Sequence, residues 1–260
     1  MDMRLTGRTA LITGASKGIG FAIARMLAAE GCHLHLVARS AGDLEAARAQ
    51  LSGTAGVEVR VHAMDLSQRG RVEELAARCP DIDILVNNAG SNPRGSIEEI
   101  DEETWRAAFD LKVFGYINMC RAYYPAMKAR RSGVIINILG NGGERVDAGY
   151  IVGAAANASL MAFTRALGGN SPVDGVRVIG VNPGPVATDR LVGLMRREAG
   201  KRFGDPERWQ ELEASCPFGR AATVDEIAAT VVLLASDHSS YTTGTIVTID
   251  GGMANRGSLI

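Results

Sequence analysis

The sequence has no surplus of either charge and no long apolar run, and each absence excludes a class of function. Its 260 residues contain 28 lysines and arginines against 29 aspartates and glutamates. This balance gives no reason to expect nucleic acid or an anionic membrane as a partner. No apolar stretch approaches the ~20 residues that span a bilayer, and the first five residues lack the apolar core of a signal peptide. We therefore expect a cytoplasmic protein that acts on a small molecule.

Cysteines are also few. The four, Cys32, Cys79, Cys120 and Cys216, are scattered and form no CxxC pair, which favours buried free thiols in a reducing compartment. We expect no metal site. Internal repeats, low-complexity tracts and linkers are absent too, so we expect residues 1–260 to form one domain with a single large core.

Apolar strand patterns and helical patterns alternate along the chain. The predicted strands are 8–13, 33–38, 57–62, 82–87, 133–138, 176–181 and 245–249. The predicted helices are 18–30, 41–52, 67–78, 102–130, 153–170 and 223–235. Strands separated by helices imply right-handed crossovers. The fold class is therefore α/β, a doubly wound parallel sheet of about seven strands in a three-layer α/β/α arrangement.

One segment breaks the alternation. Residues 188–217 separate a strand from the next helix by about thirty positions, and excursions of that length usually form lids or binding loops. Its apolar residues recur at near-helical spacing, and five cations, Arg190, Arg196, Arg197, Lys201 and Arg202, occupy much of the rest. These cations either attract an anionic substrate or belong to a solvated face that nearby acidic residues compensate.

A glycine-spaced turn follows the first predicted strand. Thr13–Gly20 reads Thr-Gly-Ala-Ser-Lys-Gly-Ile-Gly and leads into a helical pattern. Few Cβ atoms and the free N–H groups of a first helical turn allow a pyrophosphate to approach closely. The context of strand, turn and helix therefore predicts a Rossmann-type dinucleotide site. The residues expected to hold the cofactor here are Gly14, Ser16, Lys17, Gly18, Ile19 and Gly20.

Further motifs make the chain resemble the short-chain dehydrogenase/reductase family over nearly its whole length. They are Asp65-Leu66, Asn87-Asn88-Ala89-Gly90, Asn182-Pro183-Gly184-Pro185-Val186-Ala187-Thr188 and Asp250-Gly251-Gly252. The resemblance implies that Asp65 and Leu66 lie at the adenine. It places Asn88, Ala89 and Gly90 along the adenosine ribose, and Pro183, Gly184, Val186 and Thr188 on the nicotinamide side. Each asparagine could instead simply tie strand ends together. The family's long helices usually pack into homodimers or homotetramers, and the helix predicted at 102–130 is long enough to do so.

Charge at the end of the second strand indicates which cofactor is bound. An NAD-selective site places a carboxylate there for the ribose 2′-hydroxyl. This chain has Ala38 followed by Arg39, whose guanidinium can bind a 2′-phosphate through two hydrogen bonds. Lys17 adds a second cation on the same side. We therefore expect NADP(H) rather than NAD(H), unless both cations are solvated surface charges.

The catalytic half departs from the family pattern. The resemblance implies that a proton relay of asparagine, serine, tyrosine and lysine side chains carries out the family's chemistry. In a frame without gaps, those four positions hold Lys112, Gly140, Gly153 and Asn157. A second frame makes Tyr150 the tyrosine, but it needs two compensating length changes and leaves Ala154 at the lysine position. If the helix already runs through 150, Tyr150 and Gly153 are neighbours one turn apart.

Lysine and asparagine have exchanged places in the gapless frame. Because both family side chains project toward one small volume, we hypothesise a rebuilt relay of Lys112, Asn157 and Tyr150. The alternative is that Lys112 extends to solvent and Asn157 is a satisfied polar residue. The loop from Gly140 to Arg145 either offers backbone N–H donors to an oxyanion or forms a plain turn, and we favour the turn.

The sequence therefore predicts an oxidoreductase that transfers hydride between NADP(H) and a carbonyl or alcohol by a non-standard proton relay. One alternative is reduction of a C=C or C=N bond, which does not need the tyrosine. Another is a cofactor-binding protein without turnover, acting as a sensor or a structural subunit. Neither the substrate nor the direction of reaction follows from the sequence.

Overall fold

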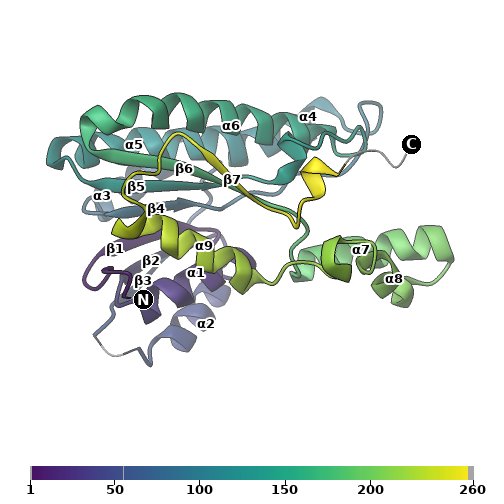
Figure 1. The fold of residues 1–260 in the computed structure, drawn as a ribbon, viewed down its shortest axis with the longest axis horizontal. Coiled ribbons are helices and arrows are strands. Elements are labelled where there is room, and N and C mark those ends of the chain that lie inside the picture. The colour runs from purple at the N-terminus through teal and green to yellow at the C-terminus, as the bar shows by residue number, and fades with distance from the viewer. Residues whose placement is uncertain (1, 55, 257–260) are drawn as a thin grey trace.

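The computed structural model describes residues 2–54 and 56–256, and its centre is one parallel sheet (Figure 1). The strand order is β3-β2-β1-β4-β5-β6-β7, and every neighbouring pair is parallel. The strands are β1 (Thr9–Thr13), β2 (His33–Ala38), β3 (Val59–Ala63), β4 (Ile84–Asn87), β5 (Gly133–Ile138), β6 (Val176–Pro183) and β7 (Ile246–Ile249). The predicted doubly wound α/β fold is confirmed. The order reverses between β1 and β4, and ligands of such sheets bind at this reversal, beyond the carboxyl ends of the strands.

Helices cover both faces of the sheet (Figure 1). One layer holds α1 (Gly18–Ala29), α2 (Ala41–Leu51) and α9 (Val224–Ala235). The other holds α3 (Arg71–Arg78), α4 (Glu102–Phe109), α5 (Gly115–Arg130) and α6 (Ile151–Asn170). The central strands β1, β4, β5 and β6 are mostly apolar because they are buried between these two layers, whereas the edge strands β3 and β7 are only partly buried.

The predicted element boundaries lie within two residues of the observed ones, with two exceptions. The helix expected from residue 67 begins at Arg71, because Gly70 has a left-handed φ of 79° and Asp65 Oδ1 instead accepts hydrogen bonds from Ser67. The helix expected over 102–130 contains a π-helical turn at Asp110–Phe114. One extra residue per turn there rotates the side chains that follow, and such π turns are frequent at functional sites.

The excursion at 188–217 folds into two helices that extend away from the sheet layers (Figure 1). They are α7 (Asp189–Phe203) and α8 (Trp209–Glu213). Thr188 caps α7 through its side chain, which accepts a hydrogen bond from the N–H of Leu191. Ion pairs Arg196–Glu207 and Arg208–Glu211 compensate part of the positive charge, as the solvated-face interpretation expects.

All four cysteines are free and buried, as predicted. Across residues 2–54 and 56–256, no helix combines the length and the apolar composition that crossing a bilayer requires.

Candidate active site

A cavity of about 920 Å³ lies over the carboxyl ends of β1, β2 and β4. Most of the residues predicted to hold a dinucleotide line it, namely Gly14, Ser16, Lys17, Gly18, Ile19, Arg39, Leu66, Asn88, Ala89, Gly90 and Thr188. Asp65, although predicted at the adenine, does not line this cavity; its Oδ1 accepts hydrogen bonds from the N–H and hydroxyl of Ser67. Its neighbours Met64 and Leu66 supply the apolar wall there.

The glycine turn fits tightly against Asn88. A Cβ built on Gly20 would lie 2.3 Å from the carbonyl oxygen of Gly14, and one on Gly14 would lie 2.9 Å from Asn88 Nδ2. Asn88 Nδ2 donates hydrogen bonds to the carbonyls of Thr13 and Gly14. Asn88 therefore does tie strand ends together, and in doing so it fixes the turn. Any larger residue at Gly14 or Gly20 would therefore force the backbone of the turn to move.

The start of α1 suits an anion. Its N-cap residue, Lys17, makes no capping hydrogen bond through its side chain, so the first N–H groups are left for a ligand. Lys17 and Arg39 both line the cavity and are exposed. Within the part of the chain that the structure describes, neither forms an ion pair. These features together fit a dinucleotide, with its phosphates at the turn.

A second cavity, of about 750 Å³, adjoins the first. The two share five lining residues: Ile19, Asn88, Gly90, Thr188 and Arg190. The predicted nicotinamide-side residues Pro183, Gly184 and Val186 line the second cavity, and so do Leu191 and Leu194 of α7. A dinucleotide bound in the first cavity therefore has one end at the mouth of the second.

Lys112 is the buried cation of this second cavity. It lies in the π turn between α4 and α5 and is 8% exposed, so it does not extend to solvent. Its Nζ donates a 2.7 Å hydrogen bond to the carbonyl of Leu139 and lies 5.9 Å from the ring centre of Tyr116. Burial, together with the nearby Arg190 guanidinium, lowers the pKa of Lys112 to about 7. It can therefore gain or lose a proton near neutral pH.

Tyr150 lines the same cavity from the other side. It is the N-cap residue of α6 rather than part of the helix, and its carbonyl accepts the hydrogen bond from Ala154 N–H. Its ring fills the space beside Gly153, where a built Cβ would lie 2.0 Å from Cζ of Tyr150. Its hydroxyl accepts a 3.4 Å hydrogen bond from Asn92 Nδ2.

Asn157 does not line either cavity. It is 1% exposed, its Nδ2 would lie 2.9 Å from a Cβ on Gly140, and its buried Oδ1 has no hydrogen-bond partner within residues 2–54 and 56–256. Lys112 and Asn157 therefore contact adjacent residues, Leu139 and Gly140. The structure brings Lys112 and Tyr150 into one cavity and leaves Asn157 behind its wall.

The loop after Gly140 is a turn, as we favoured. Asn141–Gly143 form a single 3₁₀ turn. The N–H of Gly140 donates to Asn182 Oδ1, and the N–H groups of Gly143, Glu144 and Arg145 donate within the turn. Those four donors are thus already used and are not free to hold an oxyanion.

Three residues that line the second cavity were not predicted there: no motif marked Asn92 or Arg94, and Arg190 was expected only among the cations of residues 188–217. Asn92 is buried, and its carbonyl accepts a 2.7 Å hydrogen bond from the guanidinium of Arg190. The guanidinium of Arg94 lies 5.6 Å from the ring centre of Tyr150. The segment after Gly90 carries no motif, so only its position beside the cavity reveals these contacts.

Known proteins with this architecture match the chain over nearly its whole length. The family model described as "Enoyl-(Acyl carrier protein) reductase" matches residues 14–254. The 3-oxoacyl-[acyl-carrier-protein] reductase FabG of Chlamydia muridarum is 32% identical over 258 residues, covering 98% of this chain and 100% of that protein. Galactitol 2-dehydrogenase (L-tagatose-forming) of Cereibacter sphaeroides is 34% identical over 251 residues, covering 96% of each. The crystal structure of L-sorbose reductase from Gluconobacter frateurii, complexed with NADPH and L-sorbose, aligns with a TM-score of 0.90 at 32% identity, covering 99% of this chain and 100% of that one.

Proposed function

Because the chain belongs to the short-chain dehydrogenase/reductase family and is an oxidoreductase of that family, we propose that it transfers hydride between NADP(H) and a carbonyl or alcohol of a small molecule. The single observation that carries this proposal is the continuity of the two cavities. The first, lined by the glycine turn, is here called the cofactor cavity, and the second, lined by Lys112 and Tyr150, the substrate cavity. The complex of L-sorbose reductase with NADPH supports the choice of cofactor. Lys17 and Arg39, which form no ion pair with any described residue, support it as well.

In this proposal Lys112 transfers the proton and Tyr150 holds the substrate oxygen. Lys112, Gly140, Gly153 and Asn157 stand at the four positions where the family usually has its asparagine, serine, tyrosine and lysine. When bound, the nicotinamide supplies or accepts the hydride. The Tyr150 hydroxyl, held by Asn92, hydrogen-bonds the substrate oxygen. Lys112 acts as the general acid in reduction and the general base in oxidation, because its pKa lies near neutrality.

Asn157 has a supporting role in this relay. It packs behind Gly140 and the turn that follows, so it shapes the wall against which Lys112 binds Leu139. In this proposal lysine and asparagine have exchanged positions. The Lys112 ammonium then lies in the cavity and the Asn157 amide lies outside it.

The substrate in this proposal carries an anionic group. Arg94, Arg145 and Arg190 line the cavity, and Asp147 is the one carboxylate among the described residues that line it. None of the three arginines forms an ion pair with another described residue. Leu191 and Leu194 give the cavity an apolar wall on the α7 side, and we propose that residues 188–217 act as its lid.

We also propose that residues 1–260 act as one domain and that copies pair through the long helix formed by α4 and α5. Phe114, in the π turn that joins them, is 52% exposed, so a large apolar side chain on this long helix is available for contact with a second copy.

NADPH oxidation with a panel of substrates tests the proposal. The panel contains L-sorbose, an acetoacetyl thioester, a 2-oxo acid, an enone and a cyclic imine. Turnover with any of the first three supports carbonyl reduction. Turnover with only the enone would indicate that the enzyme reduces C=C bonds, and turnover with only the imine that it reduces C=N bonds. Saturable NADPH binding with no turnover on any of them contradicts hydride transfer and favours a cofactor-binding sensor or structural subunit.

A further inference from the structure

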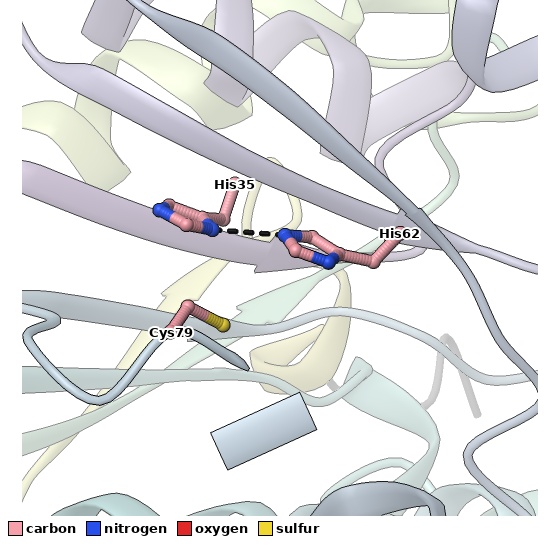
Figure 2. A group of neighbouring side chains, drawn as sticks. All are labelled: His35, His62 and Cys79. Atoms are coloured by element: carbon pink, nitrogen blue, oxygen red, sulfur yellow. Dashed lines mark hydrogen bonds between the residues drawn. The ribbon is translucent and has the colours of Figure 1, made fainter. Parts of the chain in front are cut away.

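Three side chains that can ligate a metal meet on the face of the sheet under α3 and α5. They are His35 on β2, His62 on β3 and Cys79 directly after α3 (Figure 2). His35 precedes Val37 by two residues and so shares its face of the strand, and Val37 pairs in register with His62. None of the three lines the cofactor or the substrate cavity, so the proposed reaction does not use them.

We propose that His35, His62 and Cys79 form a zinc-binding site that ties the end of α3 to the edge of the sheet. Their ligating atoms all lie within 4.8 Å of one another. Around tetrahedral zinc, bonds of ~2.0 Å to nitrogen and ~2.3 Å to sulfur place ligand atoms roughly 3.3–3.8 Å apart. His35 Nδ1 and His62 Nε2 form a 2.9 Å hydrogen bond with each other; zinc would replace this bond, and the two atoms need to separate by only a few tenths of an ångström. A pair of ligand atoms at the 4.8 Å limit needs to close by about 1 Å.

The ligand atoms already face one another. The two imidazole rings are parallel within 7°, with their centres 5.1 Å apart, and the Cys79 sulfur lies on the same side of the sheet (Figure 2). Imidazole binds a metal in its neutral form, through a ring nitrogen that carries no proton. The hydrogen bond between the two rings requires that one of the two facing nitrogens is such an acceptor.

Cys79 completes the set with a soft donor. Its thiol donates to the carbonyl of Leu75 at 3.0 Å and lies 3.3 Å from the hydroxyl of Tyr123. When zinc binds, the thiol proton passes to solvent and a zinc–sulfur bond forms. The Tyr123 hydroxyl, buried on α5, then donates to the thiolate, and such outer hydrogen bonds hold and tune metal ligands. Two imidazoles and a thiolate favour zinc over calcium or magnesium.

The surroundings permit entry of the ion. A cleft of about 220 Å³ is lined by His35 and Cys79 and also by Thr9, Arg78 and Pro80, so water can supply the fourth ligand. Two nearby cations oppose a divalent ion, but each has a carboxylate partner. Arg60 pairs with Glu58 at 2.9 Å, and Arg78 pairs with Glu74.

Zinc and cobalt titrations of the chelator-treated full chain test this site. We expect one Zn²⁺ per chain by calorimetry and a higher Tm with Zn²⁺ present, since ligands that bind only the folded state stabilise it. Co²⁺ should give the thiolate-to-cobalt charge-transfer band and the strong visible bands of a tetrahedral site. Cys79→Ser should abolish the charge-transfer band. Cys79→Ser and His62→Gln should each weaken Zn²⁺ binding beyond the roughly 10–100-fold that loss of an outer partner costs.

Matched controls separate this site from adventitious binding. Cys216→Ser removes another buried thiol, and His238→Gln removes an exposed imidazole; both should leave the stoichiometry and the cobalt spectrum unchanged. The Tm of each variant without metal reports whether it folds. A wild-type chain that binds no Zn²⁺ with saturation, or a cobalt spectrum without a thiolate band, would overturn the proposal. These readouts do not depend on NADPH oxidation, so they remain decisive even if the proposed reaction is wrong.

Discussion

The ring of Tyr150 occupies the space that a side chain on Gly153 would need. A Cβ at Gly153 would lie 2.0 Å from Cζ and 2.3 Å from Cε1 of that ring. The gapless frame places the family tyrosine at Gly153, yet the aromatic ring at this place in the fold comes from a residue three positions earlier. The Tyr150 ring can therefore hold this position only because residue 153 has no side chain.

Gly153→Ala should displace the Tyr150 ring and reduce kcat/KM. A shift of about 1 Å in a catalytic group costs around 10²-fold in rate, and kcat/KM with a substrate from the panel measures it. Gly169→Ala is the matched control, because it lies on the same helix with nothing within 4 Å of a built Cβ. Full activity of Gly153→Ala would show that the position of Tyr150 does not matter for the reaction.

Lys112→Met and Tyr150→Phe should each lower the rate of carbonyl reduction, Lys112→Met by roughly 10²–10⁴-fold, the usual contribution of a general acid. Reduction requires the ammonium form of Lys112. Because its pKa is about 7, the wild-type rate should be high below pH 7 and fall as the pH rises through 7. In the oxidation direction the profile should be reversed.

The pH profile of Lys112→Met is the control for this assignment. The residual rate of the variant should lack the inflection near pH 7, whereas Tyr150→Phe should retain it. An inflection near pH 7 that persists in Lys112→Met would assign the titrating group elsewhere and contradict the relay.

Lys112→Met should also stabilise the protein at neutral and acidic pH. The folded-state pKa of about 7 lies below the ordinary value of 10.5, so folding opposes protonation. The cost in folding free energy is fully present below pH 7, on the order of 5 kcal/mol, and fades as the pH rises toward 10. Loss of the hydrogen bond from Lys112 to the Leu139 carbonyl lowers this gain in stability by about 1–3 kcal/mol. Urea unfolding at pH 6 and pH 9 should show a gain at pH 6 that shrinks at pH 9; equal effects at both would contradict the burial of a titrating lysine.

The order and boundaries of the elements could be predicted from the sequence because they follow local patterns. Buried parallel strands are continuous apolar runs, and Thr13–Gly20 has the spacing of a dinucleotide turn. The π turn at Asp110–Phe114 could not be predicted, since its residues fit an ordinary helix. For Lys112 the sequence left two alternatives open, a side chain in the reactive volume or one extended to solvent, because lysine is normally exposed.

Contacts between segments that are distant along the chain could not be predicted from the sequence for a different reason. His35 and His62 approach only because β2 and β3 pair in one register, and a shift by one residue would place them on opposite faces. Asn92 and Arg94 lie in a segment without periodicity, and their contacts with Tyr150 depend on how that segment packs against the start of α6. The glycine turn, most of whose residues line the first cavity, could be recognised as a motif, whereas the polar groups of the second cavity could not.

Arg94→Gln and Arg145→Gln should each reduce kcat/KM for an anionic substrate by about 10-fold, which is ~1.4 kcal/mol. Both side chains line the substrate cavity, and a charged hydrogen bond to the substrate would be lost. The methyl ester of the same 2-oxo acid should show no change, which separates recognition of charge from general damage. Arg197→Gln is the control, since Arg197 is on α7 but does not line the cavity. Equal losses for acid and ester would argue against an anionic substrate.

Arg39→Gln should weaken NADPH binding and leave NADH binding unchanged. Arg39 lines the cofactor cavity at the end of β2 without an ion-pair partner in the described part of the chain, and the ribose 2′-phosphate is the group that distinguishes the two cofactors. A lost charged hydrogen bond of ~1.5–3 kcal/mol corresponds to roughly 10- to 100-fold in Kd, and Lys17→Gln should add a further loss. Fluorescence titration with both cofactors measures the ratio of the two Kd values.

Arg48→Gln is the control for this prediction. Arg48 lies on the surface of α2 and is paired with Glu45, so the variant should leave that ratio at the wild-type value. If Arg39→Gln weakens both cofactors equally, Arg39 acts on a part that they share and the preference for NADP(H) has another origin.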